Sequence, residues 1–492
     1  MTAELQQSRS DALGNSQRIH SRVIRPQTAF GASNGECLFM LPNEGLLHHG
    51  AYITVSLKSA NGNQFLPASV GIGSIVQRAI LFNGNKQVCS TDNAGILMNI
   101  QRHFKTSDYR KGTDGVRKGT YADAFMVSNE ATEAQQGRYK LDMDDPALSY
   151  NNARTAAVNA APYKVQPNTT YTPVTDSEVS PEFIFKLSDL FPSFSAGMEL
   201  PLGLCRDRWS IQLQFCEDVV NNRVVPRDGI AFASGNLVDT DSLKLVCDIL
   251  FYATPEGEIG VMEQMTEQMN RGGINFDYTD VISIVNDIPA LTGTDIPGAN
   301  QASTQSVSRL CGMSEQTCRN LLMAFPNRAG NGVLGRYFSE GAQGEMTYQV
   351  TVNNLPLYPA GAIGDKGDAQ LWDQLSQVWG IPYNVGMYQY SSETSMGNNV
   401  WAGGNQQSVS SHTINGYNQD LLRAMWNFVG VPLQLTRDNV PGAGLAIGTA
   451  PVEININRTR TSETYQAIDF YVFGHVERSF SLQGGIVLLS GM

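Results

Sequence analysis

Charged side chains are scarce in this sequence. They make up 16% of its 492 residues, against about 25% in typical soluble proteins. Hydrophobic residues account for an ordinary 41%, so neutral polar residues and glycine occupy positions that are usually charged. Desolvating Lys and Glu is costly. A surface poor in charge therefore suits a protein whose outside is largely covered by other protein molecules.

Long apolar segments are also missing. No run of 18 apolar residues is present, which predicts no transmembrane helix. The opening residues, MTAELQQSRSD, hold no apolar core of a secretory signal. We therefore expect synthesis without a signal peptide, in the reducing interior of a cell.

The cysteines do not form a disulfide pattern. Their number is odd, their spacing is irregular, and several lie inside apolar strand patterns, so we interpret them as small buried hydrophobic residues. They are Cys37, Cys89, Cys205, Cys216, Cys247, Cys311 and Cys318.

Basic charge is lacking as well, since the formal net charge is −12. A protein that coats nucleic acid needs a basic field. We therefore expect no direct sequence-specific binding of nucleic acid.

Two glycine motifs resemble catalytic or nucleotide-binding loops but lack the required context. Gly330–Gly335 fits GxGxxG, yet no strand precedes it and no clear helix follows. Gly31–Gly35 fits the GxSxG nucleophile elbow, yet a strand-like segment follows where a helix is needed. The histidines add no partner pattern, and His475 is expected in an edge turn. They are His20, His48, His49, His103, His412 and His475.

Metal-ligand spacings are absent too. Neither the pair Cys311 and Cys318 nor the adjacent His48–His49 matches a zinc spacing. The acidic turn Asp142–Asp145 lacks the glycine and glutamate of a calcium loop. Asp368, in a Lys-Gly-Asp tripeptide, is better explained as a helix N-cap. We therefore predict no catalytic residue, no cofactor-binding residue, no metal ligand and no cofactor, and a protein that is not an enzyme.

What the sequence does contain is a long internal repeat. Ser188–Asp207 (SDLFPSFSAGMELPLGLCRD) aligns without a gap with Gln419–Asp438 (QDLLRAMWNFVGVPLQLTRD), at an offset of 231 residues (420 − 189). In each copy we predict a short apolar helix opened by Asp and then a Pro-led strand. An Arg-Asp ion pair is expected to close the following turn.

Two further pairs of segments repeat in the same order. Ala79–Phe82 corresponds to Leu355–Tyr358, and each runs into a turn and a helix. Asp248–Tyr252 corresponds to Asp469–Phe473. A period this long predicts two tandem domains, because solenoid repeats span only about 20–50 residues.

Alternation of apolar and polar residues predicts β-strands in both halves. Such short period-2 segments, bounded by Gly, Asn and Pro, are typical of antiparallel sandwiches or barrels. They are Tyr52–Leu57, Ser210–Phe215, Thr347–Val352 and Val452–Asn457.

The predicted domain organisation follows from these patterns. The best helix candidate lies between the halves and ends at Gly272-Gly273. The predicted parts are a flexible N-terminal arm at 1–20, a first domain at 21–254 with an insertion at 105–180, a linker helix at 255–272, and a second domain at 273–492 with an insertion at 381–418.

With these features the chain resembles the double jelly-roll major capsid proteins of icosahedral double-stranded DNA viruses, the lineage of the adenovirus hexon. Its size and style are closest to capsid proteins of virophages and polinton-like viruses. The repeated blocks Asp189–Asp207 and Asp420–Asp438 look like the short helix and strand that precede the last strands of each roll. Leu243–Thr254 and Ala467–Phe473 look like the last strands themselves.

The resemblance implies an all-β fold of two tandem eight-stranded antiparallel jelly-roll sandwiches with short helices and long loops. It implies homotrimeric, pseudo-hexagonal capsomers in the capsid of a virion. The implied partners are neighbouring capsomers, penton and minor capsid or cement proteins, with an inner membrane left open. The alternative is a two-domain binding module of the carbohydrate-binding or tail-fibre type, with Tyr383–Tyr390 and Trp401 as its sugar platform.

Overall fold

The protein is represented by a computed structural model. It describes residues 17–27, 35–57, 64–65, 71–98, 118, 126–127, 139–140, 182–195, 197–215, 225–226, 238–252, 261–289, 303–313, 317–324, 345–357, 363–364, 378, 413–414, 417–418, 428–433, 444–449, 452–460 and 468–490.

The first half of the chain forms two antiparallel sheets, which together we call the first roll. One sheet has the order β1-β13-β4-β10, with β3 also paired to β13, and the other has the order β2-β11-β6-β7. The strands are β1 (Gln17–Ile24), β2 (Glu36–Met40), β3 (Leu46–Leu47), β4 (Tyr52–Val55), β6 (Val76–Asn83), β7 (Lys86–Asp92), β10 (Phe183–Lys186), β11 (Trp209–Phe215) and β13 (Lys244–Tyr252).

The second half forms another two sheets, the second roll. Their orders are β14-β25-β16-β22, with β23 and β26 at its sides, and β15-β24-β17-β18, with β19 beside β17. The strands are β14 (Ile274–Ile288), β15 (Ser303–Cys311), β16 (Thr317–Ala324), β17 (Glu345–Val352), β18 (Leu355–Pro356), β19 (Ile363–Gly364), β22 (Phe428–Pro432), β23 (Leu445–Ala446), β24 (Val452–Arg460), β25 (Ile468–Gln483) and β26 (Ile486–Ser490).

Both rolls interleave their strands in the same way. Numbered along the chain, the eight main strands of each roll make one sheet of order 1-8-3-6 and one of order 2-7-4-5. This interleaving is the jelly-roll arrangement. The predicted fold class is confirmed, and all four predicted period-2 segments overlap strands β4, β11, β17 and β24.

The helices are short. Helix α8 (Val261–Arg271) lies between β13 and β14, within the range where the sequence predicts a linker helix. It stops at Gly272 and Gly273, whose N–H groups both donate to the carbonyl of Gln268. No described helix is long and apolar enough to span a bilayer. Among the other described helices are α6 (Leu187–Leu190), α7 (Pro192–Ser195), η1 (Gly71–Ile75) and η3 (Leu202–Leu204), and residues 94–98 are helical as well.

Three small strand pairs lie outside the main sheets of the two rolls. The pair β8–β9 falls within the predicted 105–180 insertion and β20–β21 within the predicted 381–418 insertion. The pairs are β5 (Gln64–Phe65) with β12 (Val225–Pro226), β8 (Met126–Val127) with β9 (Tyr139–Lys140), and β20 (Thr413–Ile414) with β21 (Tyr417–Asn418).

The first strand begins earlier than the sequence indicates. Gln17 already pairs with Tyr252, so residues 17–20, assigned by sequence to the arm, belong to β1. Strand β1 lies at a sheet edge, and His20, Ser21 and Arg22 are exposed. Backbone hydrogen bonds to β13 hold such a strand without apolar alternation, which is why periodicity does not detect it.

The repeated block is not aligned as the sequence predicts. Leu202–Leu204 forms the 3₁₀ helix η3 rather than a strand, whereas Pro432 ends strand β22. The counterpart of β22 in the first roll is β10, which precedes the block. The backbone packs tightly here, because a Cβ on Gly203 would lie 2.7 Å from the nitrogen of Gly45. The Leu-x-Leu pattern therefore marks two buried side chains of a turn.

Of the other two predicted repeats, one is wrong and one is correct. Ala79–Phe82 lies in β6, the fourth strand of its roll, whereas Leu355–Pro356 is β18, the fifth, so this pairing is wrong. Ile249 and Phe470 both lie in the eighth strand of their rolls, β13 and β25. The duplication itself is present, although only one of three sequence pairings locates equivalent strands.

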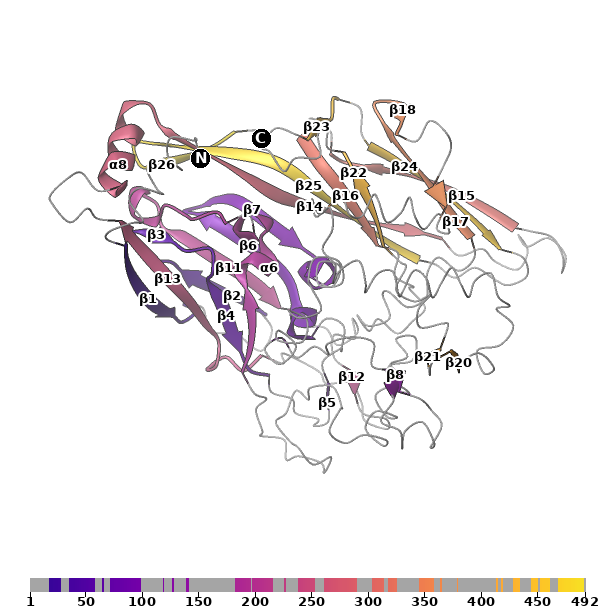
Figure 1. Ribbon diagram of the computed structural model, residues 1–492, viewed down its shortest axis with the longest axis horizontal. Helices are drawn as coiled ribbons and strands as arrows, with labels where there is room; N and C mark the ends of the chain where they lie inside the picture. The colour runs from indigo at the N-terminus through magenta and orange to yellow at the C-terminus, as the bar shows by residue number, and fades with distance from the viewer. Residues whose placement is uncertain are drawn as a thin grey trace.

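Strands β14 and β25 connect the rolls. Figure 1 shows them running side by side from α8 across the first roll to the second. Their ends near α8 contribute to the hydrophobic core of the first roll, through Ile274, Phe276 and Phe480 among others. In return, Ile96 and Leu97 of the first half belong to the core of the second roll. Each core is thus completed by residues from the other half.

Candidate functional site: the contact between the two rolls

The best-described site of this molecule is the place where the rolls meet. We call it the inter-roll contact and define it as β7, α7 and residues 203–206 of the first roll against β14, β25 and β26. Its centre is aromatic. The ring of Phe480 stacks on Phe276 at a centroid distance of 4.8 Å and lies 5.8 Å from the ring of Trp209 on β11. Phe480 and Trp209 are fully buried, so this cluster excludes water.

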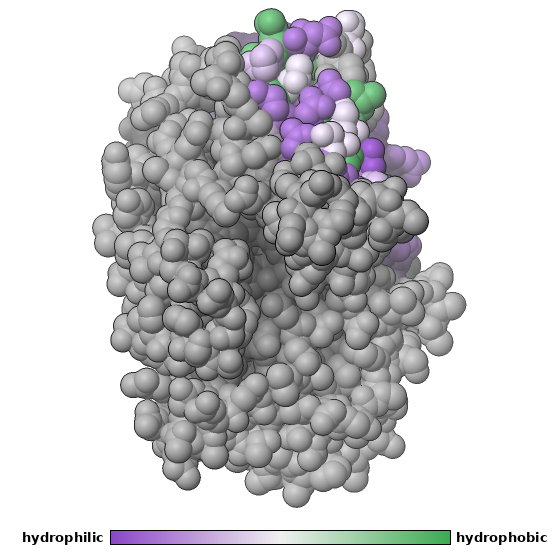
Figure 2. All heavy atoms as spheres, turned by 90° about the vertical axis from the view of Figure 1, so that its right-hand side faces the viewer, coloured by the Kyte–Doolittle hydropathy of each residue, from purple (hydrophilic) through white to green (hydrophobic). Residues whose placement is uncertain are grey.

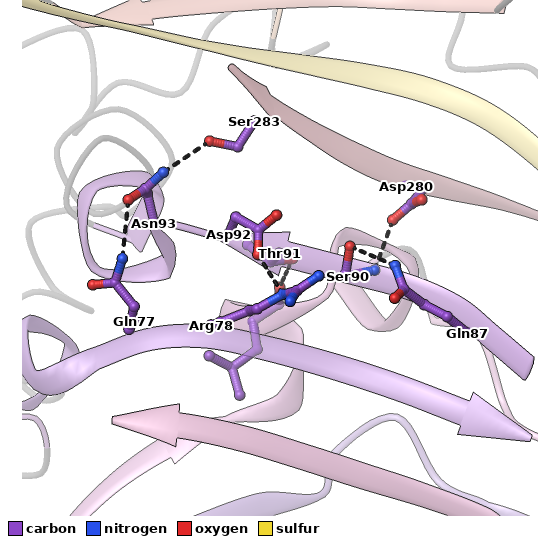
Figure 3. A network of polar contacts seen from close by, with 10 residues as sticks. Gln77, Arg78, Gln87, Ser90, Thr91, Asp92, Asn93, Asp280 and Ser283 are labelled. Atoms are coloured by element: carbon purple, nitrogen blue, oxygen red, sulfur yellow. Dashed lines mark hydrogen bonds and ion pairs between the residues drawn. The ribbon is translucent and has the colours of Figure 1, made fainter. Parts of the chain in front are cut away.

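Polar groups flank the aromatic cluster, as Figure 3 shows for β6, β7 and β14. Asn93 donates from Nδ2 to Oγ of Ser283 at 3.2 Å. The hydroxyl of Tyr278 donates to the carbonyl of Val88 at 2.7 Å, and Ser193 Oγ donates to the carbonyl of Thr279 at 2.8 Å. These bonds fix the register of β14 against the first roll.

Asp280 is the charged group of this contact. Its Oδ1 accepts the N–H of Ser90 at 3.1 Å, and its Oδ2 lies 3.3 Å from Nε of Arg478. Desolvation raises the pKa of Asp280 to about 6, and the charge of Arg478 only partly opposes this. The carboxylate bridges β7 and β25, so its ionisation affects the packing of the two rolls.

Backbone carbonyl groups of the β25–β26 hairpin accept hydrogen bonds from the first roll. Its turn residues Gly484 and Gly485 have φ of +55° and +84°. The carbonyl of Gly485 accepts the N–H of Arg206 at 2.7 Å, and that of Val487 accepts Nζ of Lys86 at 2.6 Å. Arg206 therefore contacts the hairpin and forms no ion pair with its neighbour Asp207, so that prediction is wrong for the first copy.

The two turn glycines make a matched pair for mutation. A Cβ on Gly485 would lie 2.8 Å from Cγ of Arg206, whereas nothing lies within 4 Å of a Cβ on Gly484. Both substitutions force alanine into a left-handed conformation. We expect Gly485→Ala to lower the free energy of unfolding by about 1–2 kcal/mol more than Gly484→Ala, measured by denaturant unfolding. Equal losses would show that the hairpin contact contributes nothing.

Six cysteines lie in the described part of the chain, and all are free and buried. Burial raises the pKa of the Cys247 and Cys311 thiols to about 12. Thiols of this kind are inert at neutral pH, which confirms their interpretation as small hydrophobic residues. The seventh, Cys216, lies outside the described residues.

His475 is placed differently from the prediction. It lies inside β25, buried, and its Nδ1 hydrogen-bonds to Oδ1 of Asn320. Asn320 in turn donates to the carbonyl of Val378 at 3.1 Å. The edge-turn prediction is wrong because β25 continues through Gly474. The histidine is satisfied within the core.

Several sequence motifs lie outside the described residues. They are residues 31–34 of the GxSxG motif, Asp142–Asp145, Gly330–Gly335, Lys366–Asp368, Tyr383–Tyr390, Trp401, Arg437–Asp438, His103 and His412.

Large apolar side chains remain exposed on the outer surface. On the coloured part of the face in Figure 2, mainly hydrophilic residues surround isolated hydrophobic ones. Single exposed apolar residues of this kind are common on protein surfaces. The exposed ones are Val23, Val285, Leu310, Leu355, Ile486 and Leu488.

Comparison with known proteins gives a match at the level of fold. No family model and no curated protein matches the sequence. A chain in the cryo-EM structure of the Sputnik virophage matches with a TM-score of 0.56 and 13% identity, over 97% of this chain and 89% of that one. VP54 of PBCV-1, fitted into a cryo-EM reconstruction of Sputnik, matches with a TM-score of 0.50 and 11% identity over 97% of both chains. The chain therefore has the double jelly-roll fold of viral major capsid proteins.

Proposed function

We propose that this chain is a major capsid protein and that three copies form a pseudo-hexagonal capsomer of an icosahedral shell. The observation that carries the proposal is the identical strand order of the two rolls, in a chain that aligns along 97% of its length with virion structures. Two similar rolls per chain allow a trimer to present six similar units. The role is structural rather than catalytic.

The inter-roll contact supports this role. A capsomer needs its two rolls at a fixed mutual angle, because each roll must meet the neighbouring chain in the same way. Shared cores and the backbone hydrogen bond from Arg206 to Gly485 provide such a fixed arrangement. Flexible linkage alone would leave the two units free to move.

The domain assignment within this proposal follows the sequence. We assign residues 17–254, beginning with β1, and 273–492 to the rolls, 255–272 to the linker, and the insertions at 105–180 and 381–418 to the solvent end of the capsomer. The arm before residue 17 is assigned to the inside of the shell.

The proposed partners are further copies of the chain, neighbouring capsomers, penton and minor capsid or cement proteins. The low content of charged residues, 16%, favours such extensive protein contacts. We propose no sequence-specific contact with nucleic acid. Contact with an inner membrane is left open, and the proposed location is the capsid of the virion.

Native mass spectrometry of the purified full chain tests the trimer. We expect a trimer that persists on dilution to micromolar concentration, and three-fold particles of hexagonal outline in negative stain. A stable monomer at that concentration would refute the proposal.

A surface variant sharpens this test. Leu310 on β15 is 62% exposed in the single chain, and burying one leucine in an interface contributes about 1.5–3 kcal/mol. Leu310→Asp is expected to weaken trimer association at least about 10-fold. Leu310→Ile, which keeps the apolar side chain at this position, is the matched control and should leave the trimer intact.

A further inference from the structure

Three side chains able to bind a metal meet at one place on the first roll. His48 and His49 directly follow β3, and Glu199 belongs to the segment between α7 and η3. One donor atom from each lies within 4.8 Å of the others. All three residues are partly exposed, so an ion from solvent can reach them.

Backbone pairing explains why His48 meets Glu199. Leu47 and Leu200 form an antiparallel bridge in which each N–H donates to the other's carbonyl, at 2.9 and 3.3 Å. The next residues outward, His48 and Glu199, therefore face each other in a narrow, non-hydrogen-bonded pair. Side chains in such a pair lie close together.

A bulge brings His49 to the same place. Along β13, Ile249 pairs with Leu47 and Val246 pairs with Tyr52. Four residues on one strand thus lie opposite two on the other, which marks an irregular insertion of two residues. Adjacent residues of a regular strand point to opposite faces, but a bulge redirects a side chain. The rings of His48 and His49 accordingly lie with centroids 4.1 Å apart.

Two imidazoles and one carboxylate are suitable donors for Zn²⁺. Zinc binds them at about 2.0–2.2 Å in a tetrahedral arrangement, so donors around one ion lie about 3.3–3.6 Å apart. Binding therefore requires side-chain rotations that bring the three donors, now within 4.8 Å of one another, about 1 Å closer together. Ca²⁺ and Mg²⁺ are disfavoured because they prefer oxygen ligands.

We propose that His48, His49 and Glu199 form a Zn²⁺ site that ties the β3–β4 bulge to the segment before η3. The fourth coordination position is open to water. Nδ1 of His48 already accepts the N–H of Gly50 at 3.1 Å. Zn²⁺ on Nδ1 replaces this bond, and Zn²⁺ on Nε2 requires the ring proton to move to Nδ1, which breaks the same bond. Because the bond is lost in either case, the affinity is on the order of micromolar rather than nanomolar.

Titration of chelator-treated full-length protein with ZnCl₂, followed by calorimetry, tests the site. We expect saturation at one ion per chain, and at least about a 10-fold loss of affinity in His49→Ala and in Glu199→Gln. His20→Ala, which removes an exposed histidine of β1, is the matched control and should bind like the wild type. Zinc should raise the melting temperature of the wild type and of this control only.

The proposal is overturned if the wild type shows no saturable binding up to about 100 μM Zn²⁺, or if both site variants bind as tightly as the control. If a variant fails to fold, the visible absorption spectrum of Co²⁺ added to the wild-type protein tests the site instead. Intense visible bands of a four- or five-coordinate ion support the site, and the weak spectrum of hydrated Co²⁺ refutes it.

Discussion

Replacing Phe480 by alanine is expected to lower the free energy of unfolding by about 3–5 kcal/mol and to destabilise the first roll, although Phe480 lies on a strand of the second. The ring is fully buried between Phe276, Tyr278 and Trp209. Removing it leaves a cavity in the inter-roll contact that rigid flanking strands cannot close. Denaturant unfolding of the purified protein measures the loss.

Phe473→Ala is the matched control. Phe473 lies on the same strand and is equally buried, but it belongs to the core of the second roll. Both variants should lose similar stability, and hydrogen exchange should tell them apart. Phe480→Ala should accelerate exchange in β6 and β11, whereas Phe473→Ala should accelerate it in β16 and β22. Unchanged exchange of β11 in Phe480→Ala would contradict the shared core.

The contribution of Asp280 to the free energy of unfolding should increase as the pH falls from about 7 towards 4. Its pKa is about 6 in the folded protein, above the ordinary value of 3.8. The folded state therefore binds this proton more tightly than the unfolded state. The resulting stabilisation is complete below about pH 3.8 and is lost as the pH rises through about 6. Its full size is on the order of 3 kcal/mol.

Asp280→Asn isolates this contribution. The amide cannot ionise but can still accept the N–H of Ser90, so the difference between wild type and variant should change with pH in the stated direction. Asp277→Asn, which replaces an exposed carboxylate on the same strand, is the matched control. Parallel pH profiles of wild type and Asp280→Asn would refute the role of this carboxyl group.

Protonation of Asp280 also affects how firmly the two rolls are held together. Asp280 faces Arg478 and lies near Asp92, which itself pairs with Arg78 at 2.5 Å. Protonation removes the cost of burying its charge while the hydrogen bonds around Asn93 and Tyr278 remain. We therefore expect mild acid to hold the two rolls together rather than to separate them.

Strand periodicity determined the class of fold from the sequence alone. Alternation in segments such as Ser210–Phe215 and Val452–Asn457 follows from local geometry, because successive side chains of a strand point to opposite faces. The position of α8 could likewise be predicted, since its end is marked by Gly272-Gly273. The repeat of Asp248–Tyr252 as Asp469–Phe473 correctly located the eighth strand of each roll.

Pairings between distant residues were decided only by the tertiary structure. The sequence could not show that Glu199 lies opposite His48, that His475 lies within a core strand, or that Phe480 completes the core of the other roll. Such contacts join residues that are 150 or more positions apart. They depend on sheet register and on bulges, which a one-residue shift would reverse. Short apolar patterns such as Leu202–Leu204 fit several structures, and only the surrounding packing selects one.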